Sequence, residues 1–180
     1  MKVLQPPAKD SRRALTLERL TLTYVAAEDR MRLVGLGKDG DAIVLWLTQR
    51  LCNQMVRTLT GFLEKLAEER GMLAKDAVLS FQQSAARAGQ RSLPPVTAGP
   101  DAAQALVRGI EVRQSAKRFV LTFRFGKEAR AEVALAVPGL HRWLLALHGR
   151  YLKAGWTMQT WPDWFEAPTA EPAAGPSALH

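Results

Sequence analysis

Cysteine is almost missing from this sequence, and its scarcity excludes several kinds of chemistry. Cys52 is the only cysteine in 180 residues, so no disulfide forms within the chain. A cysteine-based zinc site and a CxxC redox pair are excluded for the same reason. So little cysteine fits a reducing compartment, and we expect a cytoplasmic location. Cys52 has apolar neighbours in an expected helix, which is typical of an inert, packed thiol.

Histidine is also scarce, because the chain has only His141, His148 and His180. His141 and His148 lie seven residues apart on one expected helix, which separates them by about 10 Å along its axis. They cannot share a metal ion without ligands from a third element. We therefore expect no metal site and no cofactor, and we interpret the histidines as structural.

Long apolar runs and export signals are lacking as well. The longest apolar run, Ala42–Leu47, is far shorter than the roughly 20 residues that span a bilayer. The N-terminal sequence MKVLQPPAKDSRR has no apolar stretch of the kind found in a signal peptide. The sequence predicts no membrane partner and no export by that route.

No enzyme motif is present either. The chain has no GxSxG sequence and no Cys-His pattern for nucleophilic catalysis. The glycine-rich stretch 35–41 matches neither GxxxxGK[ST] nor GxGxxG, and a strand is expected after it where a phosphate loop needs a helix. Neighbouring carboxylates such as Glu28 and Asp29 fall in an expected turn, where solvated charge is ordinary. We expect a protein that is not an enzyme.

What the chain does have is the composition of a folded protein, with 47% hydrophobic and 23% charged residues. Apolar and polar residues alternate over 17–25, as they do in a half-buried strand. A second strand is expected over 30–34, and a short apolar strand over 42–47. A helical period then runs from Thr48, an expected N-cap, to about Arg70. The first half therefore predicts three strands followed by a helix.

The second half repeats this plan. Adjacent prolines and two glycines within 89–101 predict a linker. Strand-like patterns follow around 110–112, 119–125 and 133–137, and Pro138 opens a helix. The predicted parts are a flexible N-terminus (1–14), a first β-β-β-α unit with an extra short helix (15–88), a linker (89–104), a second β-β-β-α unit (105–155), and an aromatic-rich segment with a flexible tail (156–180).

The two halves also align in pattern when one is shifted by about 88 residues. Val44 and Trp46 then meet Val133 and Leu135, although few residues are identical. We predict an α+β fold of two tandem, pseudo-duplicated β-β-β-α units, whose antiparallel sheets are each covered on one face by a helix. Coincidence of pattern is the alternative.

The formal charge is strongly positive, +8 from 25 Lys and Arg against 17 Asp and Glu. The first 90 residues carry 14 cations against 10 acids, and the last 90 carry 11 against 7, so the excess is not confined to a basic tail. A positive excess favours anionic partners such as nucleic acid. A charge that serves only solubility is the alternative.

Alternation in the second half places a basic face on the predicted sheet. The phenylalanines of 118–125 share one face, so Arg118 and Arg124 take the other. Because a helix covers only one side, the positive face stays open to nucleic acid, although Glu111 and Glu132 dilute its charge. A solvated face is the alternative. The predicted nucleic-acid-binding residues are Arg30, Arg32, Arg113, Arg118, Arg124, Lys127 and Arg130.

Four aromatic residues lie close together near the C-terminus: Trp156, Trp161, Trp164 and Phe165. They have two interpretations, a cap on the core of the preceding unit or an anchor for a protein partner. An exposed sheet edge is another place where a partner, or a second copy of the chain, can dock.

At the level of predicted topology alone, residues 17–155 resemble the Whirly and PUR-repeat families, in which antiparallel strands precede a helix and the unit recurs. The resemblance implies binding of single-stranded nucleic acid. Those families have four strands per unit where three are predicted here, and no residue motif matches, so no binding residue carries over. The resulting hypothesis is a non-catalytic nucleic-acid-binding accessory protein. The alternative is an adaptor or assembly subunit of a protein complex.

Overall fold

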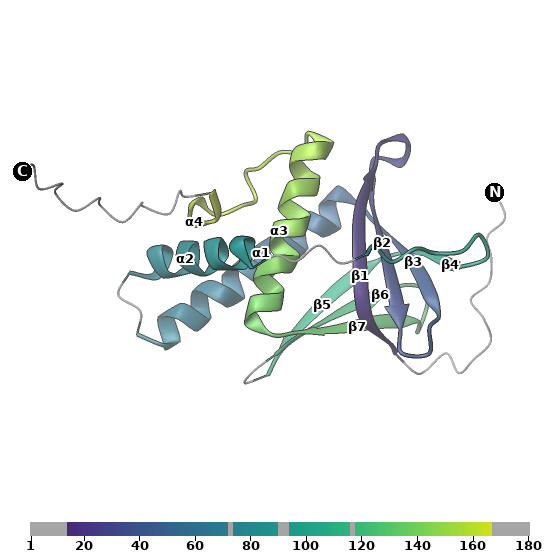
Figure 1. Cartoon of the computed structure of the whole chain (residues 1–180), viewed down its shortest axis with the longest axis horizontal. Coiled ribbons are helices and arrows are strands. Elements are labelled where there is room, and N and C mark those ends of the chain that lie inside the picture. Colours follow the sequence, from purple (N-terminus) through teal and green to yellow (C-terminus); the bar gives the residue numbers. More distant parts are fainter. Residues whose placement is uncertain (1–13, 72–73, 90–93, 116–117, 167–180) are drawn as a thin grey trace, which may run out of the picture.

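A computed structural model describes residues 14–71, 74–89, 94–115 and 118–166 of the chain. The predicted flexible ends, 1–13 and 167–180, lie outside these residues, as does His180. The fold is α+β (Figure 1). Its elements are β1 (Leu15–Val25), β2 (Arg30–Gly37), β3 (Ala42–Leu47), α1 (Gln49–Glu69), α2 (Lys75–Ala88), β4 (Ala103–Leu106), β5 (Gly109–Gln114), β6 (Phe119–Arg124), β7 (Arg130–Leu135), α3 (Val137–Ala154) and α4 (Asp163–Glu166).

The described strands form one mixed sheet in the order β4-β3-β2-β1-β7-β6-β5. Strands β1 to β3 and strands β5 to β7 each pair antiparallel, as predicted. The prediction of separate, purely antiparallel sheets is wrong, because β1 pairs with β7 and β3 pairs with β4, both in parallel. These pairings satisfy backbone groups that would otherwise stay open at the edge of each three-stranded set.

The sheet is curled so that its two ends approach each other. Strands β4 and β5 lie at opposite ends of the strand order, yet only Val107 and Arg108 separate them in the chain. The amide of Val107 donates to the Trp46 carbonyl at 2.9 Å, and the amide of Arg108 donates to the Arg124 carbonyl at 2.8 Å. The chain from Leu106 at the end of β4 to Gly109 at the start of β5 spans three residue steps, which reach at most about 10 Å, so the two ends of the sheet must lie close together.

The main core lies inside this curl, beneath α1 and α3 (Figure 1). The predicted inward face of β6 is confirmed, since Phe119, Leu121 and Phe123 are buried there. Helix α1 begins after Thr48, whose hydroxyl accepts a hydrogen bond from the Leu51 amide at 3.4 Å. Burial of each large apolar side chain of the core contributes about 1.5 to 3 kcal/mol to folding, so the helices and the inner face of the sheet stabilise one another.

The outer face of β1 to β3 is covered by residues 94–102, which we call the covering segment. Val96 packs there in a second buried cluster with Val34 and Val44. The segment is held by two hydrogen bonds at 2.7 Å, one from the Val96 amide to the Thr21 hydroxyl and one from Arg19 to the Pro94 carbonyl. These residues fall within the predicted linker, and β4 also begins inside it.

Candidate nucleic-acid interface

The outer face of β5, β6 and β7 carries three of the seven predicted basic residues, Arg113, Arg124 and Arg130, and no helix of the described residues covers it. The strand register arranges its side chains in rows, and an acidic row lies between rows that carry arginine. From one end to the other the rows are Gly109, Arg124 and Arg130; Glu111, Thr122 and Glu132; and Arg113, Val120 and Ala134. The face is therefore striped in charge and not uniformly positive.

The acidic row pairs with the arginines on both sides. Arg124 donates to Glu111 at 2.6 Å. One carboxylate oxygen of Glu132 lies 3.0 Å from Arg113 and 3.8 Å from Arg130. The same oxygen accepts a hydrogen bond from the Thr122 hydroxyl at 3.1 Å. On this face, three of the seven predicted binding residues thus have a carboxylate partner: Arg113, Arg124 and Arg130.

These ion pairs have a structural cause. Arg124 and Arg130 are direct cross-strand neighbours, an arrangement of like charges that opposes sheet formation. Glu111 and Glu132 relieve that repulsion. An exposed pair such as Arg124–Glu111 contributes only about 0 to 1 kcal/mol, so a phosphate group can compete with it.

The first-half arginines do not join this face. Strand β2 is separated from β6 by β1 and β7 in the sheet order, which keeps Arg30 and Arg32 apart from the second-half arginines. Arg30 lies 3.8 Å from Glu28, in the turn between β1 and β2. Arg32 is half-buried beside Trp46 in the strand register.

Two predicted cations, Arg118 and Lys127, are exposed and have no ion-pair partner within the described residues. Sequence reasoning missed Arg108, which is exposed and lies beside Arg124 through its backbone hydrogen bond. The short interval between β4 and β5 would have revealed it, but β4 begins inside the predicted linker. We call Arg108, Arg124, Lys127 and Arg130 the basic end of the sheet.

The aromatic residues of the C-terminal segment lie in the core. Trp156, Trp161, Trp164 and Phe165 are all buried. Three of the rings lie against Tyr151 or His148 of α3, with centroid distances of 5.1 Å from Tyr151 to Trp156 and 4.9 Å from His148 to Phe165, and the ring of Trp164 lies against His141 and Phe165. The geometry matches the capping interpretation, and a partner would reach these side chains only after the segment had left the core.

Two distant carboxylates hold the segment in place. The Trp156 indole donates to Asp29 at 2.8 Å, and the Trp164 indole donates to Glu64 at 2.9 Å. Tyr24 donates to the same Asp29 oxygen at 2.9 Å. The hydrogen bonds from Trp156 and then Tyr24 lower the pKa of the Asp29 carboxyl. The segment is therefore tied both to the turn after β1 and to α1.

The cysteine and the two described histidines are buried within the helical layer. Burial raises the pKa of the Cys52 thiol to about 12, which keeps it protonated and unreactive. Burial lowers the pKa of His141 to about 4. Among the described residues no group of three or more His, Cys, Asp and Glu side chains is placed to hold a metal ion.

Comparison with known proteins finds no relative of this chain. No family model, curated protein or solved structure matches the chain. No helix of the described part is both long enough and apolar enough to cross a bilayer.

Proposed function

We propose that the chain is a non-catalytic nucleic-acid-binding accessory protein that contacts the sugar-phosphate backbone through the outer face of β5 to β7. One observation carries the proposal: cations outnumber carboxylates on and beside this uncovered face. The cations are Arg108, Arg113, Arg118, Arg124, Lys127 and Arg130, and the carboxylates are Glu111, Glu128 and Glu132.

The mode of binding follows from the chemistry of the face. The side chains between the arginines are Val120 and Thr122, so no aromatic ring on β6 is available to stack on a base. Phosphate contacts carry little sequence information. We therefore expect binding that is indifferent to sequence, strongest at the basic end, and steeply weakened by salt.

The halves of the sheet also support the repeated-unit hypothesis, which we propose as the origin of the fold. Each half has three antiparallel strands followed by a helix, α1 after β3 and α3 after β7. Because β1 and β7 pair in parallel, the two sets of strands run in the same sense across one sheet. A tandem duplication produces this relation without reversing either half.

The direct test measures binding of a labelled single strand of about 20 nucleotides by fluorescence anisotropy at low salt. We expect Arg124→Glu with Arg130→Glu to weaken binding at least about tenfold. The matched control is Arg87→Glu with Lys153→Glu, which changes the net charge equally on α2 and α3. An equal loss in both variants, or no binding by the unaltered protein, contradicts the proposal.

The carboxylates provide a test in the opposite direction. Glu111→Gln with Glu132→Gln frees the arginines that these residues now neutralise, so affinity for the same strand should rise about three- to tenfold. A purely structural ion-pair network predicts no change in binding and a small loss of stability. The sign of the effect separates the two roles.

The alternative function, an adaptor, is favoured by the sheet edge more than by the aromatic segment. Leu106 at the end of β4 is 44% exposed, an unusual position for a large apolar side chain beside an open edge. Docking through the aromatic segment is tested by deletion of residues 156–180. An adaptor that uses this segment keeps its fold and loses its partner, whereas a core cap leaves an unfolded protein.

A further inference from the structure

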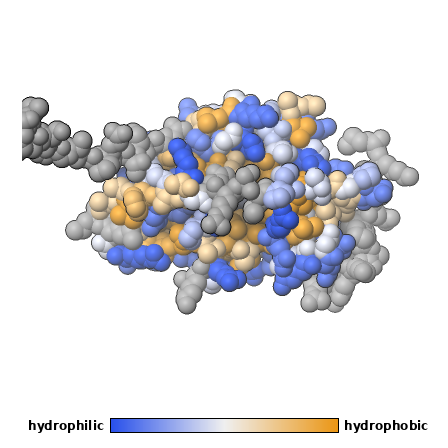
Figure 2. Space-filling model, viewed as in Figure 1, coloured by the Kyte–Doolittle hydropathy of each residue, from blue (hydrophilic) through white to orange (hydrophobic). Residues whose placement is uncertain are grey.

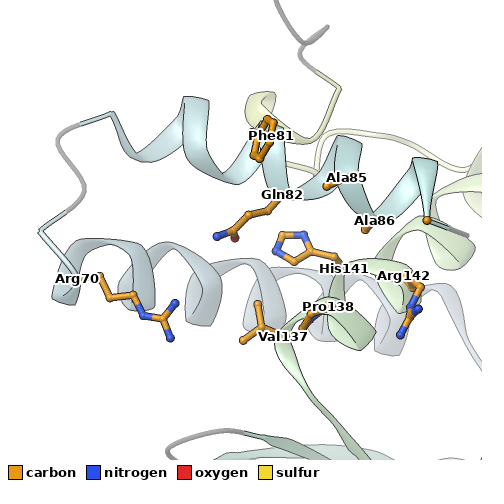
Figure 3. A pocket seen from close by; sticks show the side chains of 10 residues that line it. Arg70, Phe81, Gln82, Ala85, Ala86, Val137, Pro138, His141 and Arg142 are labelled. Atoms are coloured by element: carbon orange, nitrogen blue, oxygen red, sulfur yellow. The ribbon is translucent and has the colours of Figure 1, made fainter.

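A groove of about 440 Å³ lies between α2, the C-terminal end of α1 and the first turns of α3. Figure 3 shows its lining side chains. The floor is apolar and comes from α2 and the start of α3, with Phe81, Ala86 and Pro138 among its residues. Phe81 is 65% exposed, and apolar residues gather over α2 at the left of Figure 2. Its volume falls in the range of about 300 to 1,000 Å³ that is usual for small-molecule sites.

Three sources of positive potential surround this apolar floor. Arg70 and Arg142 lie towards opposite ends of the groove in Figure 3, and neither has an ion-pair partner within the described residues. The N-terminus of α3 borders the groove through Val137, and its N-cap, Ala136, has no side chain that accepts a hydrogen bond. Helix N-termini and arginines both favour a carboxylate.

His141 adds an independent polar feature between the two arginines. Its ring lines the groove, is only 1% exposed, and has no hydrogen-bond partner at Nε2. The Gln83 amide fixes the tautomer of the ring. Its nitrogen donates to the His141 carbonyl at 3.3 Å, so its oxygen must face Nδ1, at 2.7 Å. Nδ1 therefore carries the proton, and Nε2 has a free lone pair.

A buried acceptor without a donor costs free energy that a ligand can recover. The groove thus offers an apolar surface, cations without ion-pair partners in the described residues, and a buried hydrogen-bond acceptor at His141 Nε2. We propose that this groove binds a small amphipathic carboxylate that also carries a hydroxyl donor, a hydroxyaryl or hydroxyalkyl carboxylic acid. The carboxylate lies against Arg70 or Arg142, the apolar body covers Phe81 and Pro138, and the hydroxyl donates to His141 Nε2. This site is independent of the sheet face proposed above.

The test uses 4-hydroxyphenylacetate as the probe, with amide chemical shifts of the whole chain as the readout. Phenylacetate lacks the donor, and 2-(4-hydroxyphenyl)ethanol lacks the carboxylate. We expect the probe to shift signals of α2 and of the first turns of α3, and to bind at least about fivefold more tightly than either analogue. Equal affinity for all three compounds, or no shifts in these segments, overturns the proposal.

Substitutions within the groove complete the test. Ala86→Leu fills the floor and should weaken binding of the probe at least about tenfold, while Ala77→Leu, on the same helix outside the groove, should leave it unchanged. Arg70→Gln or Arg142→Gln should abolish the advantage of the carboxylate probe over the alcohol. Unchanged binding by the Ala86 variant, or an advantage that survives both arginine changes, contradicts the proposed site.

Discussion

The outer face of the sheet differs between its two halves: it is apolar and buried on β2 and β3, and charged on β6 and β7. On β2 and β3 the outer residues Val34 and Val44 are apolar and buried beneath the covering segment. On β6 and β7 the outer residues include Arg124 and Glu132, and no helix or strand of the described residues lies over them. Among the described residues the chain covers one of these faces with its own segment and fills the other with charge, so the second face is the one that we propose for an external partner.

The first prediction tests this contrast with the same substitution on each face. Val44→Asp places a carboxylate beneath the covering segment and should cost about 3 to 5 kcal/mol of unfolding free energy. Val120→Asp places it among arginines on the open face and should cost less than about 1 kcal/mol. Urea unfolding of both variants measures the difference. Similar costs at the two positions contradict the contrast.

The second prediction asks whether the helical layer, rather than either outer face, sets acid stability. The pKa of His141 is about 4 in the fold against 6.5 in the unfolded chain. The neutral form is therefore favoured in the fold, and stability is complete above pH 6.5 and falls as the unfolded chain takes up the proton. We expect a loss of about 2 to 4 kcal/mol by pH 4, measured by urea unfolding across that range. In His141→Phe this decline should be absent.

The third prediction compares the hydroxyl groups of Thr21 and Thr122, each of which makes a hydrogen bond on one of the two outer faces. Thr21→Val removes the acceptor of the Val96 amide and should cost about 1 to 2 kcal/mol, because a partly buried donor loses its partner. Thr122→Val removes one donor from Glu132, which keeps Arg113, and should cost about 0.5 kcal/mol. Thermal unfolding of both variants checks the order. A larger loss at Thr122 would falsify the view that the open face is only weakly coupled to the fold.

Local patterns were sufficient to predict many elements. The helix expected from Thr48 to Arg70 is α1, Gln49–Glu69, because its cap and its apolar period are both local signals. The extra short helix expected in the first unit is α2, Lys75–Ala88. The inward phenylalanines of β6 follow from simple alternation. In each case the neighbours that determine the structure are a few residues away in the chain.

The parts that were not predictable depend on distant neighbours. The parallel pairing of β1 with β7 joins Leu15 to Ala131, and nothing in either segment identifies the other. The ion pairs on the open face require the strand register, because Glu132 meets Arg113 from 19 residues away. The aromatic segment had two interpretations since the acceptor of the Trp156 indole is 127 residues distant. Local sequence indicates which residues are charged or apolar, whereas contacts between distant segments decide which of them remain exposed to a partner.

The most direct measurement of the central claim is the salt dependence of oligonucleotide binding, from about 25 mM to about 200 mM salt. If Arg124 and Arg130 contact phosphates, the slope of log affinity against log salt should be shallower by about 1.4 in the Arg124→Glu, Arg130→Glu variant than in the unaltered protein. The Arg87→Glu, Lys153→Glu control should keep the original slope. A face variant with an unchanged slope, whatever its affinity, would show that the outer face of β5 to β7 does not bind the strand.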